Sequence, residues 1–414
     1  MSTHNALMVD RVAPALSAAA LGRVGAFDVS VKDDFAEIAP IWRAFQKGAQ
    51  TTPFQDFDWV QCWLDAFDED DRPRLVIVLL HLGNDLCGIL PLYETRHMTG
   101  RVVSWMADAS SDYCMPLLSD AGLSAWQDGN AEAILSLASG HLPGVDLVKL
   151  TNQPADLAGK PNPFATFGRP VASGEAHYTE VGTPWKPFYE ALRSSKTRSR
   201  LRQKWRRLAK RGRLVFRSAK GTDEVEAALM QIIDWKIEQL HERGNRNPFM
   251  ESDGSRAHLT RTLLCYAHSG VVSGKRGLRV FGLYLDGEMI AGYASFVENG
   301  RISVFVNSYA PDLHTDCSPG LLLLVRILEF ASRTGHTTLD LMRGGEAYKQ
   351  DWCDKQVLLV DSLHPLTMRG RVMAGLHRLK LDLKHRLSAN PAAKRFILSM
   401  NKRLKGQGAE AGGR

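Results

Sequence analysis

The sequence predicts an α/β protein built from two similar units, and three observations support this. Segments with the alternation typical of strands are interleaved with segments of helical periodicity along most of the chain. The length of 414 residues suits two domains rather than one. A strand–turn–strand pattern occurs twice, at 75–94 and at 278–297, and each copy has a glycine inside its second strand. These features together indicate a duplicated α/β unit.

The first unit is expected to span residues 25–185. Apolar patterns predict strands at 27–31, 74–82, 86–94, 102–106 and 146–151, and helices at 33–47, around Trp59 and at 124–139. Gly83 and Asn84 predict a tight hairpin turn. The Pro-rich stretch 154–170 is interpreted as a connection. Residues 1–24 are interpreted as a disordered extension, since their Ala-rich run is too short and too weak for a signal peptide.

The second unit is expected to span residues 186–365. It opens with a basic helix from about 185 to 211, followed by a strand at 214–217 and helices at 223–242 and 254–268. Strands at 278–285, 289–298 and 302–308 predict a meander, and a helix from Ser318 to about 333 precedes strands at 338–341 and 357–363. Residues 366–414 are predicted to form a basic helical tail, in which Val372, Leu376, Leu379 and Leu383 share one face.

The composition is that of a soluble globular protein, with 44% hydrophobic and 23% charged residues and no apolar run long enough to span a bilayer. The six cysteines include no CxxC pair, and no His/Cys spacing suggests zinc. We therefore expect no metal site and a reduced, cytoplasmic protein. Cys317 and Cys353 flank the motifs described below, so a nucleophilic thiol is one interpretation, although a small packed residue is the favoured one.

The net charge of +7 is unevenly distributed. Residues 194–213 carry ten Lys and Arg and no acid, and residues 366–405 carry eleven against Asp382 alone, which leaves −13 for the rest of the chain. Two basic elements on an acidic body indicate an anionic partner: phosphate groups, an anionic membrane surface or nucleic acid such as tRNA. In the first element we expect Arg198, Arg202 and Arg206 to hold anionic parts of a substrate. The tail fits either an amphipathic helix on the inner membrane or one packed on the protein body.

The segment Ser318-Pro319-Gly320-Leu321 reads as the start of a helix. Ser318 suits a cap, Pro319 suits the first turn, and Gly320 lets a ligand approach the backbone. The free N–H groups of such a turn, up to Leu321 and beyond, favour an anion such as a pyrophosphate. Ordinary helix capping is the alternative interpretation.

Twenty residues later, Arg343, Glu346 and Lys349 fall within one short, glycine-broken segment after a strand. Lys349 would pair with a phosphate or a developing negative charge, and Tyr348 would contact the substrate or donate a proton. Asp340 and Glu346 are the carboxylates nearest to act as general base. The alternatives are a surface lysine and structural ion pairs. The order of strands and helices places the Ser318 loop and the segment 343–349 at one edge of the sheet. We therefore interpret the Ser318 loop as the donor end, and the segment 343–349 as the acceptor end, of an acyl-transfer site.

Several of these motifs together resemble the bacterial CelD-like acyltransferases of the GNAT superfamily, from about residue 27 to 363. The matching segments are TPFQDFDWV (52–60), Ser111-Asp112-Tyr113, the basic helix end 206–212, Trp235-Lys236-x-x-Gln239, Ser318-Pro319-Gly320 and Arg343-Gly344-x-Glu346-x-Tyr348-Lys349-x-x-Trp352. The resemblance implies an α/β tandem GNAT fold, with two mixed central sheets flanked by helices, related to the Fem-type aminoacyl transferases. It also implies that Trp235, Lys236 and Arg343 lie on the substrate side.

The resemblance implies N-acyl transfer, most simply acetyl transfer, by direct attack of the acceptor on the thioester. The donor would be acetyl-CoA, and the acceptor an amine or hydroxyl of a cell-envelope or exopolysaccharide precursor. One departure matters: residues 316–320 (DCSPG) replace the usual Arg/Gln-x-x-Gly-x-Gly/Ala loop. This leaves aminoacyl-tRNA or another donor open. The alternative is a non-catalytic accessory protein of cellulose or other polysaccharide synthesis, peripheral on the inner membrane.

Overall fold

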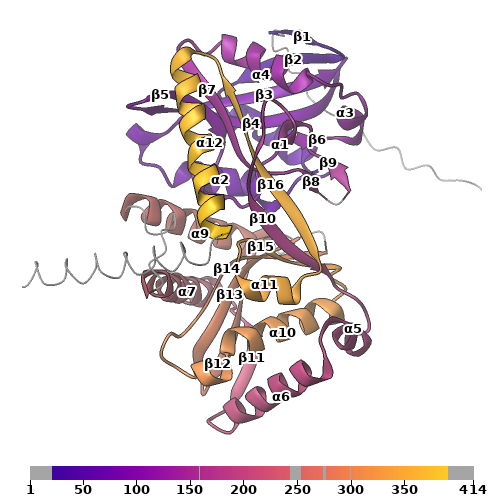
Figure 1. Ribbon diagram of the computed structural model, residues 1–414, viewed down its shortest axis with the longest axis vertical. Coiled ribbons are helices and arrows are strands. Elements are labelled where there is room, and N and C mark those ends of the chain that lie inside the picture. The colour runs from indigo at the N-terminus through magenta and orange to yellow at the C-terminus, as the bar shows by residue number, and fades with distance from the viewer. Residues whose placement is uncertain (1–20, 158, 243–252, 274–276, 299, 390–414) are drawn as a thin grey trace, which may run out of the picture.

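The computed structural model describes residues 21–157, 159–242, 253–273, 277–298 and 300–389, which form two lobes stacked along the long axis (Figure 1). Most of the N-terminal lobe follows the predicted elements. Its elements are β1 (Gly22–Val24), β2 (Phe27–Lys32), α1 (Phe35–Phe45), η1 (Pro53–Gln55), α2 (Phe57–Asp65), η2 (Glu69–Asp71), β3 (Arg74–Leu82), β4 (Asp85–His97), β5 (Gly100–Trp105), η3 (Asp108–Ser110), β6 (Leu117–Leu118), α3 (Asp120–Ser124), α4 (Asn130–Gly140) and β7 (Val145–Pro154).

Two expectations for this lobe need correction. The helix predicted at 124–139 begins only at Asn130, as α4, because α3 ends at Ser124 and Gly129 adopts a left-handed φ of 86° before α4. Strand β1 pairs with β2, so residues 22–24 are ordered rather than part of a disordered extension. The rest of that predicted extension, residues 1–20, lies outside the described residues.

The C-terminal lobe also contains the predicted helices and strands, with one helix divided. After β7 the chain runs through β8 (Asp156–Leu157), β9 (Lys160–Pro161), η4 (Pro163–Ala165), β10 (Val171–Glu180), α5 (Trp185–Leu192), α6 (Ser195–Ala209), β11 (Leu214–Ser218), α7 (Thr222–Glu242), α9 (Asp253–Ser273), β12 (Gly277–Leu285), β13 (Glu288–Glu298), β14 (Arg301–Tyr309), η5 (Thr315–Cys317), α10 (Pro319–Arg333), β15 (Thr338–Arg343), α11 (Ala347–Trp352), β16 (Lys355–Pro365) and α12 (Met368–Ala389). Of these elements, η4 and α12 pack on β7 of the N-terminal lobe. The predicted basic helix is α5 plus α6, because Ser194 begins a new helix by accepting a hydrogen bond from Thr197 N.

Fourteen of the described strands form one continuous sheet, and β8 and β9 form a small separate pair, so the expectation of two separate central sheets is wrong. The order is β1-β2-β3-β4-β5-β7-β16-β10-β15-β14-β13-β12-β11, with β6 on β4. Strand β16, from the end of the second unit, lies beside β7 of the first, and β10, from the first, lies beside β15 of the second. The two lobes thus exchange one strand each, and β10 pairs with β16 where they meet (Figure 1).

Within this sheet the two lobes repeat one pattern, which confirms the repeat seen in the sequence. The hairpins β3–β4 and β12–β13 each have a two-residue turn, Gly83-Asn84 and Asp286-Gly287. In each lobe the antiparallel run then ends in a single parallel pair, β5 with β7 and β14 with β15. Both parallel pairs have only three matched residues, so the strands separate at the same place in each lobe.

An aromatic cluster holds the lobes together on one face of the sheet. Phe54 of η1 and Trp59 of α2 lie with their rings 5.2 and 5.3 Å from that of Phe296 on β13. Trp59 is also 5.4 Å from Tyr266 on α9. All four side chains are buried. Because each large ring contributes a large buried apolar area, this cluster makes the lobe interface part of the protein core.

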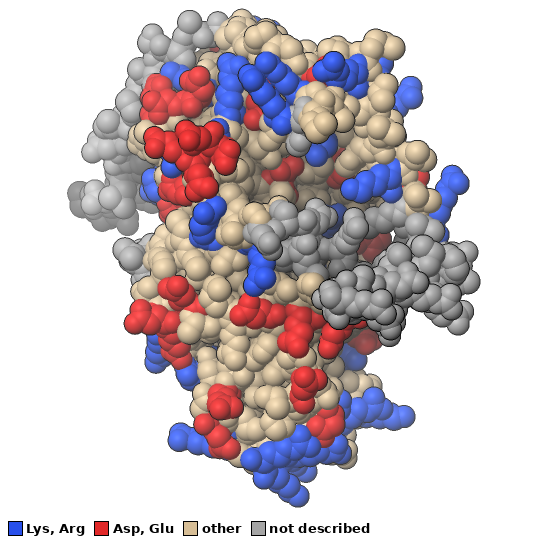
Figure 2. All heavy atoms as spheres, turned by 90° about the vertical axis from the view of Figure 1, so that its left-hand side faces the viewer, with Lys and Arg blue, Asp and Glu red and all other residues tan. Residues whose placement is uncertain are grey.

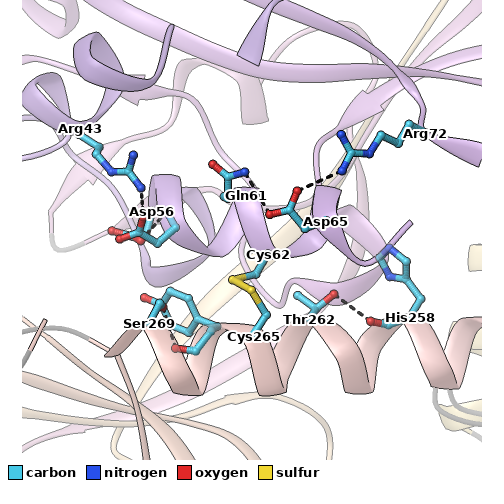
Figure 3. The surroundings of a disulfide bond; sticks show 12 residues. Arg43, Asp56, Gln61, Cys62, Asp65, Arg72, His258, Thr262, Cys265 and Ser269 are labelled. Carbon is cyan, nitrogen blue, oxygen red and sulfur yellow. Dashed lines mark hydrogen bonds and ion pairs between the residues drawn. A yellow bond between two sulfur atoms is a disulfide. The ribbon is translucent and has the colours of Figure 1, made fainter. Parts of the chain in front are cut away.

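A disulfide between Cys62 and Cys265 lies beside this cluster and joins α2 to α9 (Figure 3). The Cα atoms are 5.5 Å apart, and 203 residues separate the two cysteines along the chain. The expectation of six reduced cysteines is therefore wrong for this pair. No spacing in the sequence could reveal it, because only the packing of the two lobes brings the cysteines together.

The C-terminal helix α12 returns to the N-terminal lobe and packs on β7, β16 and β10 (Figure 1). Residues 390–414, including the second helical segment expected after Pro391, lie outside the described residues. None of the described helices is long and apolar enough to cross a membrane.

Candidate active site

An opening in the sheet lies between β14 and β15. These parallel strands pair only through Arg301–Thr338, Ile302–Leu339 and Ser303–Asp340, although β14 continues to Tyr309 and β15 to Arg343. In the described part of the chain, the side of β14 that faces β15 has no strand partner beyond Ser303. An extended ligand can add to such an edge through backbone hydrogen bonds.

The N-terminus of α10 follows the open end of β14. Ser318 adopts a left-handed φ of 53°, and its side chain does not cap the helix as predicted. Its hydroxyl instead accepts a hydrogen bond from Lys204 Nζ at 2.6 Å. At Gly320 a Cβ atom would lie 3.3 Å from the Tyr309 ring, so glycine allows this close approach. Leu321 is half-buried. The first turn of α10 is left with a positive dipole end and a lysine beside it.

The basic helix α6 borders this loop. Arg211 donates two hydrogen bonds to Asp316, at 3.0 and 2.7 Å, and Arg207 lies 3.5 Å from the same carboxylate. The hydrogen bond from Arg211 lowers the pKa of Asp316 to about 2. Asp316 therefore stays ionised, and its negative charge is balanced by the two arginines. Lys and Arg side chains crowd the lower end of the molecule in Figure 2, where α6 lies.

A hollow of about 350 Å³ lies between α5, α6 and α10. Its lining includes Trp185, Tyr189, Arg202, Trp205, Arg206 and Arg326. The Arg326 guanidinium lies 3.9 Å above the Trp205 ring. Arg198, predicted to act with Arg202 and Arg206, instead forms an ion pair with Glu190 at 2.7 Å. Aromatic rings next to arginines suit a planar group that carries phosphates.

Lys349 is buried next to the end of β15, with only 4% of its surface exposed. Its Nζ donates hydrogen bonds to the carbonyls of Arg343, at 2.6 Å, and Met342, at 3.4 Å, and lies 3.2 Å from Glu346 Oε2. At Gly344, whose φ is 143°, a Cβ atom would lie 2.6 Å from Nζ. Lys349 therefore shapes the segment after β15, and the alternative of a surface lysine does not describe it.

Asp340 lies at the centre of a hydrogen-bonded group that includes both lobes. Its carboxylate is fully buried and accepts hydrogen bonds from the Tyr113 hydroxyl at 2.9 Å, Arg301 Nη1 at 2.8 Å and Met342 N at 2.7 Å. Burial raises the pKa of Asp340, and the charge of Arg301 opposes that increase. With three partners in place, this carboxylate is not free to take a proton from an acceptor.

Asp112, next to Tyr113, is a site residue that the sequence-based set of candidates does not include. Burial raises its pKa to about 6, although Lys349 and Arg343 oppose the shift. Glu346 differs: burial would raise its pKa, but Lys349 and Lys236 lower it overall. The only sequence signal for Asp112 is the Ser111-Asp112-Tyr113 motif. Its place beside the second lobe follows from the folded arrangement.

Arg343 points toward the boundary between the lobes. Its guanidinium donates to Asn152 Oδ1 at 2.5 Å and to the carbonyl of Ser173 at 3.3 Å. Asn152 N in turn donates to Asp361, whose other oxygen lies 2.8 Å from His377 Nε2 on α12. Arg343 thus links the candidate site to the C-terminal helix.

Tyr348 faces the opening together with Asn307 and Tyr293. Asn307 Nδ2 donates to the Tyr348 hydroxyl at 3.4 Å, and the Tyr293 hydroxyl donates to the Gly320 carbonyl at 3.2 Å. Burial raises the pKa of Tyr348 far above its ordinary value, so the hydroxyl keeps its proton. Trp235, on α7 next to Lys236, is half-buried against the core rather than fully exposed to a ligand.

The two cysteines near the site do not fit a nucleophile. Cys317 is fully buried, and burial raises its pKa. Burial also raises the pKa of Cys353 to about 12. Because the thiolate is the reactive form, these environments favour small packed residues.

Comparison with known proteins identifies the segment that carries this geometry. Residues 195–350 match the family model described as "Acetyltransferase (GNAT) domain". These residues are therefore similar to a GNAT acetyltransferase domain. The matched segment contains α6, the loop at Ser318, the β14–β15 opening and Lys349, whereas Asp112, Tyr113 and Asn152 lie outside it.

Two solved structures show the same overall fold. FemX is 11% identical, over 78% of this chain and 95% of that chain, with a TM-score of 0.52. L-PGS from Bacillus licheniformis is 13% identical, over 84% of this chain and 97% of that chain, with a TM-score of 0.50. A comparison with curated proteins gives no match. At these identities the similarity concerns the fold alone.

Proposed function

We propose that this protein is a CelD-like acyltransferase that moves an acyl group from acetyl-CoA, or a related acyl-CoA, to an amine or hydroxyl of a cell-envelope or exopolysaccharide precursor. The observation that carries the proposal is the opening between β14 and β15, inside the GNAT-type segment. The N-terminus of α10 follows the end of β14, and Lys349 and Glu346 lie next to the end of β15.

The donor would bind along the open edge of β14 with its phosphates at α10. Lys204, held beside Ser318, supplies positive charge there, and the helix dipole adds to it. Arg202 and Arg206 in the neighbouring hollow are suited to the nucleotide end of the donor. These contacts replace the glycine-rich loop that the sequence lacks.

The acceptor would bind on the side of Glu346 and Lys236. Its nitrogen or oxygen attacks the acyl carbon, a bond forms between them, and the carbon–sulfur bond breaks. We assign the base that takes the acceptor's proton to Asp112, because this half-buried carboxyl follows Ser111 and precedes Tyr113, which donates a hydrogen bond to Asp340 across the lobe boundary, and because burial raises its pKa to about 6. Tyr348, whose raised pKa keeps its hydroxyl protonated, donates a hydrogen bond to the leaving sulfur, and the thiolate takes its proton from water. Asp340 positions Arg301 and Tyr113.

Calorimetric titration with acetyl-CoA, with CoA as comparison, tests the donor. We expect micromolar binding by the wild type and none by Gly320→Leu, because the larger side chain would collide with Tyr309 at the start of α10. Gly140→Leu, where an added Cβ meets open space on α4, is the matched control. Near-ultraviolet circular dichroism checks that each variant is folded.

Absence of binding to either ligand by the folded wild type would contradict the acyl-CoA proposal. That result would favour aminoacyl-tRNA as the donor, or a non-catalytic accessory role in polysaccharide synthesis.

A further inference from the structure

The C-terminal helix α12 presents a row of large apolar side chains to solvent. The exposed fractions are 71% for Met368, 63% for Val372, 62% for Leu376, 64% for Leu379 and 54% for Leu383. At helical spacing these residues form one stripe about 22 Å long. A contiguous apolar strip of this kind on a protein surface indicates an interaction site.

The stripe cannot be the face with which α12 packs on the protein, because that face is already occupied. Ala374 and Leu381 are buried against the sheet, and a Cβ atom at Gly370 would lie 1.8 Å from the carbonyl oxygen of Asp146. Thr367 fixes the start of the helix by donating to Asp146 Oδ1 at 2.6 Å and accepting from Gly370 N at 3.1 Å. The contact between His377 and Asp361 fixes its middle.

Positive charge surrounds the stripe. Residues 368–389 carry six Lys and Arg and one acid, Asp382. Arg369 and Lys380 are exposed near one edge of the stripe, and Arg371 is exposed near the other, where Asp382 is also exposed. The chemistry of this face is therefore a narrow apolar strip with cations along both edges.

We propose that α12 is a membrane-docking helix that lies flat on an anionic lipid surface. The stripe would enter the boundary between headgroups and acyl chains, and the cations on both margins would contact anionic headgroups. This attachment is parallel to the membrane plane and is consistent with the lack of a membrane-spanning helix among the described residues.

Other occupants fit this face less well. A second copy of the chain would bring its own cationic margins against these. The chain beyond residue 389 would also be repelled by the cations beside the stripe, since it carries five Lys and Arg and no acid between 394 and 405. A nucleic acid would meet the charges but would leave the apolar stripe in water. An anionic bilayer satisfies both features.

Co-sedimentation of the full-length protein with vesicles tests the proposal. Vesicles of phosphatidylcholine with phosphatidylglycerol should bind the wild type, and binding to phosphatidylcholine alone should be much weaker. Leu376→Ala/Leu379→Ala should lower the partition coefficient for the anionic vesicles about tenfold or more. Arg371→Gln/Lys380→Gln should lower it by a similar factor on anionic vesicles only.

The matched control is Leu313→Ala/Leu358→Ala, which removes two leucines that are 50% and 48% exposed outside α12. Its binding should equal that of the wild type. Because all these positions are exposed, the variants should unfold at the wild-type temperature.

Three results would overturn the proposal. The first is a wild type that does not sediment with anionic vesicles. The second is unchanged binding by the leucine variant, which would place membrane contact elsewhere. The third is a concentration-dependent dimer in sedimentation velocity that the leucine variant abolishes, without vesicle binding, which would assign the stripe to a second copy.

Discussion

Asp112 and Asp340 both lie near Lys349, but their surroundings differ. Asp340 is fully buried and accepts hydrogen bonds from Tyr113 and Arg301, which fix its position. Asp112 is half-buried, and burial raises its pKa to about 6. A carboxyl that titrates close to neutral pH can both take and release a proton under physiological conditions. The difference between these two carboxyls supports the proposal that Asp112 is the base.

The raised pKa of Asp112 makes a prediction for stability. In the unfolded chain this carboxyl has the ordinary pKa of 3.8, so folding favours its protonated form. The protonated Asp112 carboxyl therefore stabilises the folded protein at low pH, and this stabilisation is lost as pH rises from about 4 to about 6. Asp112→Asn cannot ionise, so its stability relative to the wild type should increase over this window, by up to about 3 kcal/mol at 1.36 kcal/mol per pKa unit.

Urea unfolding of both proteins at several pH values measures this difference. Asp354→Asn, at an exposed position, is the matched control. A difference between Asp112→Asn and the wild type that does not change with pH would contradict the assigned pKa.

Lys349 makes a second prediction at the level of single side chains. Lys349→Met keeps most of the side-chain volume but leaves two backbone carbonyls and Glu346 without their cation. We expect turnover to fall below detection and the free energy of unfolding to fall by about 1–3 kcal/mol. Acyl-transfer assays and urea unfolding check the two effects. Lys355→Met, an exposed lysine of β16, should change neither, whereas undiminished turnover in Lys349→Met would exclude Lys349 from the site.

Local sequence predicts some of the candidate site and cannot predict the rest. Glu346, Tyr348 and Lys349 fall in one glycine-broken segment, so spacing alone groups them. Tyr113 and Asp340 are 227 residues apart and meet only because the lobes pack. The roles of Arg301 and Asp112 depend on the same contact. Arg198, Arg202 and Arg206 are equally spaced along α6 and look alike in the sequence. In the structure, however, only Arg198 forms the ion pair with Glu190.

The helices and strands likewise divide into those that local sequence predicts and those that depend on distant contacts. The hairpins at 83–84 and 286–287 are predictable because turn residues and flanking alternation lie within a few positions. Strand β10 is missed because its middle holds Gly174 and Glu175, which have low strand propensity. Its neighbours in the sheet, β15 and β16, are more than 150 residues away. The continuous sheet depends on these distant pairings of β10, so local sequence could not predict it.

Helix α6 illustrates how an element's partners change its interpretation. A run of ten cations without an acid suggests a surface that awaits an anionic substrate. In the structure Arg207 and Arg211 neutralise Asp316, and Lys204 holds Ser318. Part of the charge thus organises the loop at Ser318, and Arg202 and Arg206 line the neighbouring hollow.

The two lobes form one folding unit rather than two independent domains. Strand exchange, the aromatic cluster around Trp59 and the Cys62–Cys265 disulfide all cross between them. The separation of 203 residues means that the disulfide closes a long loop in the unfolded chain. Such bonds typically stabilise by about 2–4 kcal/mol.

We therefore expect Cys265→Ser to lower the free energy of unfolding by about 2–4 kcal/mol in urea. A reducing agent should lower the wild-type value by a similar amount and leave Cys265→Ser unchanged, which is the internal control. A thiol reagent should find four free cysteines in the unreduced, denatured wild type. Six reactive thiols would contradict the bond.

The exchange of β10 and β16 also sets an order of events when the chain is made. Strand β7 ends at Pro154, but its neighbour β16 begins at Lys355, about 200 residues later. At about 5–20 residues per second, a ribosome needs roughly 10–40 s to make that stretch. Throughout this interval the newly made first lobe has an unfilled edge beside β7, where an extended segment of another chain could add. The first half of the protein is therefore the last to be completed.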